Sequence, residues 1–155
     1  MIKKKLIIIL MLLTFNNCGF KVVNKDSLYN FSVINVVVNG DNKIGFYLKN
    51  NLLNNSNKKG KEIKLNINIE KKKDIKEKNI KNEITKYEII IKAKVNYDVL
   101  FHNKKGHFTV TKIGNYKVES QYSQTLINED NLIDDLRENL AEDIQENLSV
   151  LTNDL

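Results

Sequence analysis

Apolar and polar residues alternate over three long stretches of the chain, at residues 62–70, 87–101 and 108–122. A period of two is typical of a strand that buries one face and leaves the other in water. The three stretches follow one another along the chain without an intervening helix, so they predict a meander of antiparallel strands. Between the second and third we expect a turn at residues 102–107, where Gly106 could adopt a positive φ, and we expect a bulge at Gly114.

Two further segments differ from this pattern. Residues 31–38 are continuously apolar and rich in β-branched side chains, which predicts a strand buried on both faces, and Asn39, Gly40 and Asp41 would end it in a turn. Residues 71–82 carry so many charges that burial is excluded. They are expected to form a long connection between strands.

Two amphipathic helices are predicted from apolar residues three or four positions apart. The shorter covers residues 42–53, with Ile44, Leu48 and Leu52 on one face. In the longer, the apolar residues are Leu132, Leu136, Leu140, Ile144 and Leu148. Glu129 and Asp130 would lie in its first turn, where a negative charge suits the helix dipole.

The order strand, helix, strand, strand, strand, helix predicts an α+β two-layer sandwich. It has a four-stranded mixed sheet whose first two strands are parallel, with both helices on one face. The opposite face would be flat and polar. Its expected residues are Lys64, Asn66, Asn68, Lys86, Glu88, Lys92, Lys94 and Asn96.

The N-terminus has the order of parts of a signal peptide. Lysines at positions 3–5 precede an apolar run that is too short to span a bilayer and ends shortly before Cys18. We therefore predict a signal peptide at residues 1–17, a lipidated tether at 18–30 and one domain at 31–155. A lone cysteine in an exported chain has no disulfide partner, and Cys18 is the predicted lipid anchor. A buried N-terminal element and an unmodified cysteine are the alternatives.

Charge is distributed unevenly along the chain. Residues 58–94 contain 13 lysines and 6 acidic residues, whereas residues 119–155 contain 10 acidic residues and Arg137 alone. An exported chain seldom meets nucleic acid, so an anionic lipid or a protein partner is the expected counter-charge. The candidate contacts are Lys73, Lys76, Lys78 and Lys81. A solvated loop is the alternative interpretation.

No catalytic arrangement is recognisable in the sequence. His102 and His107 bracket the predicted turn without a cysteine or carboxylate motif that would complete a metal site. No glycine-rich phosphate loop and no nucleophile elbow is present either. We expect no metal, no cofactor and no enzymatic activity.

Three stretches resemble the LptE family, especially its alphaproteobacterial branch. They are Cys18-Gly19-Phe20-Lys21, the strand opening Thr85-Lys86-Tyr87, and the segment from Gly114 to Gln124. As in that family, an acidic helix start such as Asn128-Glu129-Asp130 precedes a leucine-rich final helix such as residues 140–148. The resemblance extends over nearly the whole chain and depends on the order of these motifs.

The resemblance implies an outer-membrane lipoprotein, anchored through Cys18 on the periplasmic side, that plugs the barrel of an LptD-like partner. Such a protein helps to assemble the barrel and contacts lipopolysaccharide on its way to the outer leaflet. Gly19 differs from the aspartate that retains many lipoproteins at the inner membrane. The alternative is a periplasmic lipoprotein that binds a small ligand or acts as a chaperone or pilotin for another envelope complex.

Overall fold

The computed structural model describes residues 29–154, which fold in the predicted order of elements. These are β1 (Phe31–Gly40), α2 (Asn42–Asn54), β2 (Lys61–Lys78), β3 (Ile84–Val99), β4 (Lys104–Lys117) and α3 (Tyr122–Asn153). The predicted signal peptide and most of the predicted tether, including Cys18, lie outside the described residues. Within residues 29–154, no helix is both long and apolar enough to cross a bilayer.

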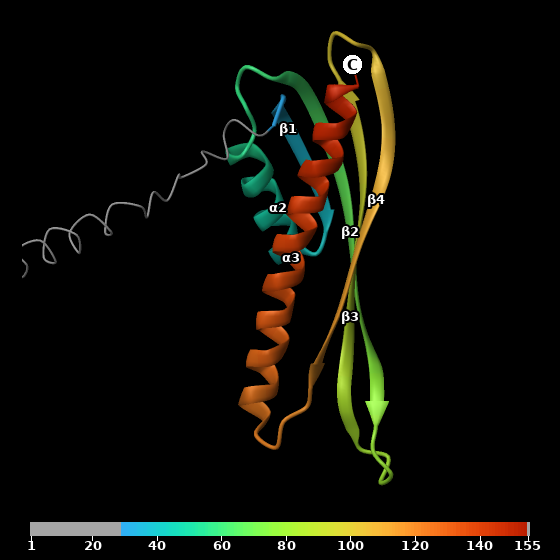
Figure 1. Ribbon diagram of the computed structural model, residues 1–155. Coiled ribbons are helices and arrows are strands. Elements are labelled where there is room, and N and C mark those ends of the chain that lie inside the picture. The colour runs from blue at the N-terminus through green and yellow to red at the C-terminus, as the bar shows by residue number, and fades with distance from the viewer. Residues whose placement is uncertain (1–28, 155) are drawn as a thin grey trace, which may run out of the picture.

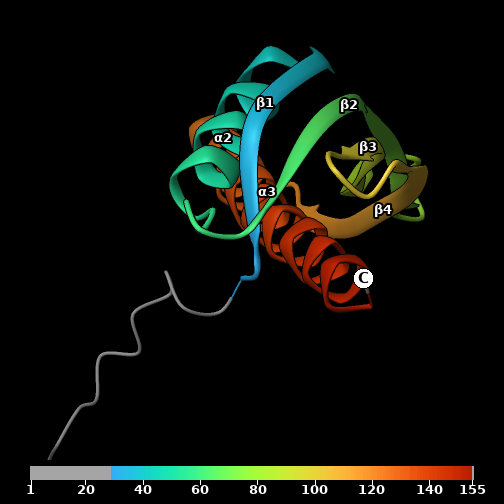
Figure 2. The same ribbon diagram turned by 90° about the horizontal axis from the view of Figure 1, so that it is seen from above.

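The strands form one sheet in the order β1-β2-β3-β4. β1 is parallel to β2, and the two remaining pairs are antiparallel. Both helices lie on one face of the sheet, which confirms the predicted two-layer architecture (Figure 1). Seen from above, the sheet curls around α3 (Figure 2). The two ends of the described chain meet, because the Asn30 side chain donates a 3.0 Å hydrogen bond to that of Asn153.

The core lies between the helices and the alternating positions of the strands. Ile63, Ile67 and Ile91 are at most 1% exposed, and the polar residues between them face outward. The α2 helix begins where Asp41 accepts a 3.0 Å hydrogen bond from the backbone N–H of Ile44, as an N-cap residue does. The aliphatic side chains fill the space between the two layers.

The prediction that the first strand is buried on both faces was wrong. Phe31, Val33 and Val36 are buried, but Ile34 and Val37 are 44% and 47% exposed. The physical reason is the position of β1 at the edge of a sheet whose outer face has no covering layer. A continuous apolar sequence therefore does not imply two-sided burial here.

The charged segment 71–82 is not a long connection. β2 continues to Lys78, and only residues 79–83 turn before β3 begins. Pairing continues along this length, with Lys71 opposite Ile91 and Lys73 opposite Ile89. The backbone of a charged strand gains the same hydrogen bonds as that of an apolar one, so a strand can form without a buried face.

The predicted roles of two glycines were also wrong. β4 already begins at Lys104, and the positive φ angles in the preceding turn belong to Phe101 and Asn103. Gly106 is paired within the strand, where a Cβ would come 2.5 Å from the hydroxyl of Tyr97. At Gly114 the register is unbroken, and a Cβ there would come 2.6 Å from Leu132. Both glycines make space for a neighbouring side chain.

The final helix begins earlier than its apolar pattern predicts. It starts at Tyr122, which the sequence placed in the preceding strand, and Glu129 and Asp130 lie two turns inside it. The loop before it is closed by Thr125, whose buried hydroxyl accepts a 2.8 Å hydrogen bond from the Glu119 N–H. A polar contact fixes this helix start, and hydrophobic periodicity does not detect such contacts.

Candidate functional site

The β2–β3 hairpin extends beyond β1 and forms an arm at the lower end of the molecule (Figure 1). Pairing between β1 and β2 ends at Gly40 and Ile69, whereas β2 continues to Lys78. We call residues 71–90, which form this extension, the lysine arm. The four predicted lipopolysaccharide contacts all lie on it, three in β2 and Lys81 in the turn.

The four candidate lysines do not form one cluster. Lys73 pairs with Glu129 of α3, and Lys76 pairs at 2.7 Å with Glu88 of β3. At the turn, the ammonium of Lys78 donates a 3.0 Å hydrogen bond to the side chain of Asn82. Of these four, Lys78 and Lys81 have no ion-pair partner among the described residues, and both lie at the tip of the arm.

Lys73 belongs to a polar network that joins the lysine arm to α3. Its ammonium lies 2.6 Å from Glu129 Oε2, which also accepts a 2.6 Å hydrogen bond from the hydroxyl of Tyr116. The same ammonium lies 4.4 Å from the centre of the Tyr87 ring, close enough for a cation–π interaction. The two tyrosine rings stack with their centres 5.7 Å apart. We call these four residues the Lys73 network.

The Lys73 network changes the acidity of its members. Burial raises the pKa of Tyr116, and the hydrogen bond to Glu129 raises it further, to about 12. Burial alone would raise the pKa of Glu129, but hydrogen bonds from Lys73 and Tyr116 outweigh this effect and hold it below 4.5. Burial would lower the pKa of Lys73, and its hydrogen bond with Glu129 instead raises it above 10.5.

The Lys73 network was not predicted from the sequence, although signals for it exist there. Glu129 lies three positions before Leu132 and seven before Leu136, so it falls on the apolar face of its helix. Tyr87 and Tyr116 are paired across β3 and β4 on the face that the helices cover. An acidic residue on a buried helix face needs a partner, and only the extension of β2 reveals that Lys73 supplies it.

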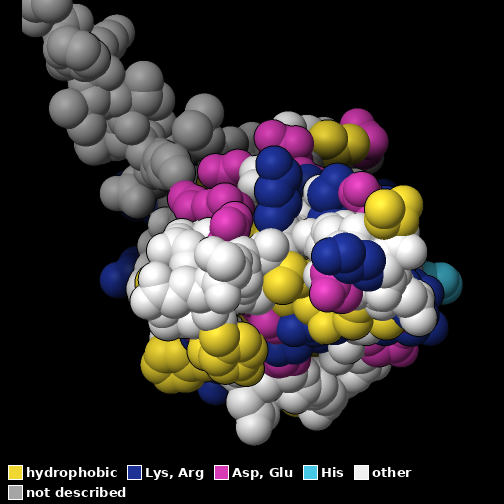
Figure 3. Space-filling model, turned by 90° about the horizontal axis from the view of Figure 1, so that it is seen from below, with side chains coloured by type: hydrophobic (Ala, Val, Ile, Leu, Met, Phe, Trp, Pro, Cys, Tyr) yellow, Lys and Arg dark blue, Asp and Glu magenta, His cyan; other side chains and the backbone are white. Residues whose placement is uncertain are grey.

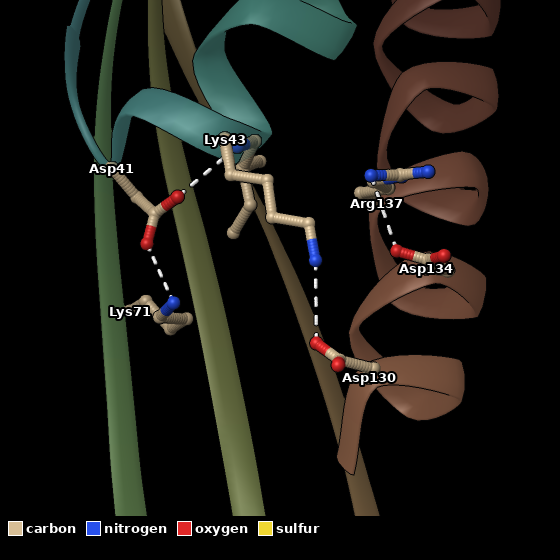
Figure 4. A network of polar contacts seen from close by, with 7 residues as sticks. Asp41, Lys43, Lys71, Asp130, Asp134 and Arg137 are labelled. Atoms are coloured by element: carbon tan, nitrogen blue, oxygen red, sulfur yellow. Dashed lines mark hydrogen bonds and ion pairs between the residues drawn. The ribbon is translucent and has the colours of Figure 1, made fainter. Parts of the chain in front are cut away.

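A second set of charged contacts ties α2 to its neighbours (Figure 4). Asp41, the N-cap of α2, pairs at 2.6 Å with Lys71 of β2. Burial would raise the pKa of Asp41, but hydrogen bonds from Lys71 and the Ile44 N–H lower it overall. From the first turn of α2, Lys43 reaches Asp130 of α3 at 3.2 Å. The lysine arm, α2 and α3 are therefore joined by opposite charges.

The lower end of the molecule mixes all types of side chain (Figure 3). Ile80 at the tip of the lysine arm is fully exposed, and Ile75 is 51% exposed. On α3, the side chains of Tyr122, Leu126 and Ile127 are also exposed. This end therefore offers apolar surface next to the unpaired ammonium groups of Lys78 and Lys81.

The outer face of the sheet is polar, as predicted. Its centre is rich in asparagine, and the amide of Asn39 donates to Asn68 at 3.2 Å while that of Asn96 donates to the Asn66 carbonyl at 3.3 Å. Next to this patch, a hollow of about 330 Å³ is lined by Asn68, Glu70, Lys92, Lys94, His107 and Thr109. Neither helix covers this face.

A further hollow lies on the helix side. It measures about 730 Å³ and is lined by one flank of α2 and by Arg137 of α3. Arg137 stacks over the Tyr47 ring at 4.6 Å and pairs with Asp134 at 3.1 Å. No group of histidine, cysteine and carboxylate side chains suited to a metal occurs within residues 29–154.

A four-stranded mixed sheet covered on one face by two helices defines the structural class of this protein. The same fold occurs in the crystal structure of rare lipoprotein B from Shewanella oneidensis, with a TM-score of 0.60 and 12% identity over 76% of this chain and 95% of that one. The solution structure of an uncharacterized lipoprotein B from Nitrosomonas europaea matches with a TM-score of 0.62 and 16% identity, over 87% and 93% of the two chains.

A putative lipoprotein from Caulobacter crescentus is also similar, with a TM-score of 0.56 and 11% identity over 82% of this chain and 93% of that one. No protein-family model matches the sequence, and no curated protein matches it significantly. The likeness therefore establishes a shared fold that spans nearly the whole length of three proteins described as lipoproteins.

Proposed function

We propose that this protein is a lipid-anchored envelope lipoprotein that occupies the lumen of an LptD-like outer-membrane barrel. There it helps the barrel to assemble and assists the transport of lipopolysaccharide to the outer leaflet. The observation that carries the proposal is the shared fold with proteins described as lipoproteins, in a chain whose motifs follow the order found in LptE. Acyl chains on Cys18 would supply the anchor.

The two faces of the sheet support this role. One face is buried under helices, and the other is polar, with Asn66, Asn68 and Asn96 at its centre. A polar face suits the wall of a water-filled lumen, where amide and ammonium groups can exchange hydrogen bonds between water and the barrel.

Contact with lipopolysaccharide is proposed at the tip of the lysine arm. Lys78 and Lys81 are the candidates that no carboxylate neutralises within the described chain, and fully exposed Ile80 lies between them. Ammonium groups attract phosphates, and an apolar side chain between them could contact acyl chains. Lys73 and Lys76 are already paired and are expected to contribute less.

A crosslinking experiment in envelope membranes tests the barrel proposal. A photoreactive residue at Asn66, Lys92 or Asn96 would face the barrel, and one at exposed Glu138 of α3 serves as the control. We expect crosslinks from the sheet positions to a large outer-membrane barrel, and co-purification of that barrel with the protein in detergent. Failure of an LptD-like barrel to co-purify would overturn the proposal.

The 730 Å³ hollow favours one alternative, a periplasmic lipoprotein that binds a small ligand or acts as a chaperone or pilotin. Its volume is within the range of ligand pockets, and Tyr47 and Arg137 line it. Crosslinks exclusively to soluble periplasmic proteins, or from Glu138 as efficiently as from the sheet positions, would favour this alternative.

A further inference from the structure

The two edges of the sheet differ in how they are protected. β4, at one edge, has lysines at four of its fourteen positions, namely Lys104, Lys105, Lys112 and Lys117. The part of β2 that extends beyond β1 is rich in lysine too. Charged side chains, lysine above all, are a common means of preventing another strand from pairing with an exposed edge.

β1, at the other edge, lacks this protection. Its ten residues, FSVINVVVNG, contain no charge and no proline. A register shift between Val33 and Asn35 interrupts its first half, but from Asn35 to Gly40 its pairing with β2 is regular. Val37 in this regular part is 47% exposed. An uncharged edge of this kind presents unpaired backbone groups that can receive a further strand.

The surface next to β1 has space for such a strand. A hollow of about 390 Å³ runs beside residues 35–41 and is bounded on the other side by Gly45, Phe46 and Lys49 of α2. Phe46 is 72% exposed although it lies in the middle of a helix. Gly45 is buried and allows α2 to lie close to the sheet, because a Cβ there would lie 3.0 Å from Val38.

We propose that the free edge of β1 receives an extended segment of the barrel partner as a fifth strand. This inference rests on the proposed function and specifies the surface that the partner engages. The segment carries an apolar side chain that packs on Phe46 and a carboxylate that pairs with Lys49. Main-chain hydrogen bonds to β1 supply affinity, and these two side-chain contacts supply selectivity.

Charge complementarity argues for a partner segment over a second copy of this chain. Lys49 is exposed and has no ion pair among the described residues, whereas the N-cap carboxylate of α2, Asp41, is already paired with Lys71. In a symmetric pairing of two β1 edges, each copy would bring another Lys49 and no free carboxylate. A partner strand that carries an acidic residue satisfies Lys49 without this repulsion.

The test uses the full chain in its complex with the LptD-like barrel. A photoreactive residue is placed at Phe46, which is 72% exposed on α2, and the matched control is placed at Glu138, which is exposed on α3. We expect crosslinks to the barrel from Phe46 and a far lower yield from Glu138. Mapping the crosslinked peptide should locate an extended segment with an acidic residue.

Variants provide the second measurement. Val37→Lys adds the missing edge charge, and Phe46→Ala removes the packing surface; each should lower the affinity for the barrel roughly tenfold. Phe101→Ala, at a 93% exposed aromatic residue in the β3–β4 turn, is the control and should have no effect. Phe46 and Phe101 are largely exposed and Val37 is about half exposed, so the thermal unfolding midpoint of the isolated protein should change little.

The outcomes separate the two proposals. If the barrel co-purifies but Phe46 crosslinks no better than Glu138, the edge inference is wrong and the barrel proposal stands. If Phe46 crosslinks to a second copy or to a protein other than the barrel, the partner is misidentified. If no barrel co-purifies at all, both proposals are wrong.

Discussion

The two halves of α3 are attached to the sheet by different kinds of interaction. In the upper half, Leu140, Ile144 and Leu148 are completely buried in the aliphatic core. In the lower half, Glu129 binds Lys73 and Tyr116 beside the stacked rings of Tyr87 and Tyr116. Apolar burial is non-directional and independent of pH, whereas the Lys73 network requires defined distances and protonation states. The attachment of the upper half of α3 therefore depends on how well side chains fill the core, whereas the attachment of the lower half depends on charge.

The largest loss of stability is expected from a substitution that creates a cavity beside the upper half of α3. Ile144→Ala should reduce the free energy of unfolding by about 3 kcal/mol, because burial is lost and a cavity remains. Urea denaturation followed by circular dichroism measures this change. Val150→Ala, on the same helix but at a 61% exposed position, is the control and should change stability by less than about 0.5 kcal/mol. Similar losses in both variants would contradict the assignment of the core.

A smaller loss of stability is expected from a substitution in the lower half of α3. Glu129→Gln keeps the size of the side chain but removes the charge that Lys73 and Tyr116 share, and should cost about 1–2 kcal/mol at pH 7. Urea denaturation again provides the measurement. A variant as stable as the wild type would show that the Lys73 network contributes nothing to the attachment of α3.

The stability difference between the wild type and Glu129→Gln should depend on pH, and the pKa of Glu129 determines the direction of the change. The pKa of Glu129 is lower in the folded protein than its ordinary value of 4.5, so its contribution is present above pH 4.5. The contribution is lost as the pH falls through the folded-state pKa. The stability gap between wild type and Glu129→Gln should therefore narrow below pH 4.5, whereas the gap for Ile144→Ala should not depend on the charge of Glu129.

Tyr116 provides a spectroscopic test of the Lys73 network. Its phenol should ionise near pH 12, above the ordinary value of 10.0, because burial and Glu129 oppose the phenolate. The difference in tyrosinate absorbance between the wild type and Tyr116→Phe isolates this group. Repeating the comparison in the Glu129→Gln background should give a lower pKa. An unchanged midpoint would mean that Glu129 does not influence the phenol.

The smallest effect is expected on the outer surface of the lysine arm. Lys76→Ala removes the 2.7 Å pair with Glu88, in which the lysine side chain is 48% exposed. Exposed pairs of this kind contribute roughly 0–1 kcal/mol because water and salt screen them. Thermal unfolding at low and high salt should show a small loss that high salt abolishes. A loss as large as that of Glu129→Gln would remove the distinction between the surface of the arm and the Lys73 network.

Most of this fold could be predicted from the sequence, because most elements bury one face and their apolar residues therefore recur with the period of a strand or a helix. Alternation in residues 62–70 and the apolar spacing around Leu140 correctly identify a strand and a helix. The errors occur where hydrogen bonds or charge pairs decide the structure. β2 continues through Lys71 and Lys73 because β3 offers backbone partners, and α3 begins before Glu129 because a threonine closes the preceding loop.

The candidate site was predictable to a lesser extent. The sequence placed the four lysines together on a connecting loop, whereas three of them lie in β2. It could not reveal that Lys73 and Lys76 find carboxylates while Lys78 and Lys81 do not. Those partners come from different elements, and their approach depends on the register of β2 with β3 and on the position of α3. Pairing between distant elements is a tertiary property, which local patterns do not encode.

The hydrogen bond between Asn30 and Asn153 has a consequence for the time course of folding. These side chains are separated by 123 positions in the chain, and the adjacent Lys61 ammonium binds the Thr152 carbonyl at 2.6 Å. A chain that emerges N-terminus first presents β1 long before the last turn of α3 exists. The hairpins can form early from local contacts, but the domain closes only when the final residues arrive. Until that moment the nascent chain is an open sheet, which any chaperone that escorts it must shield.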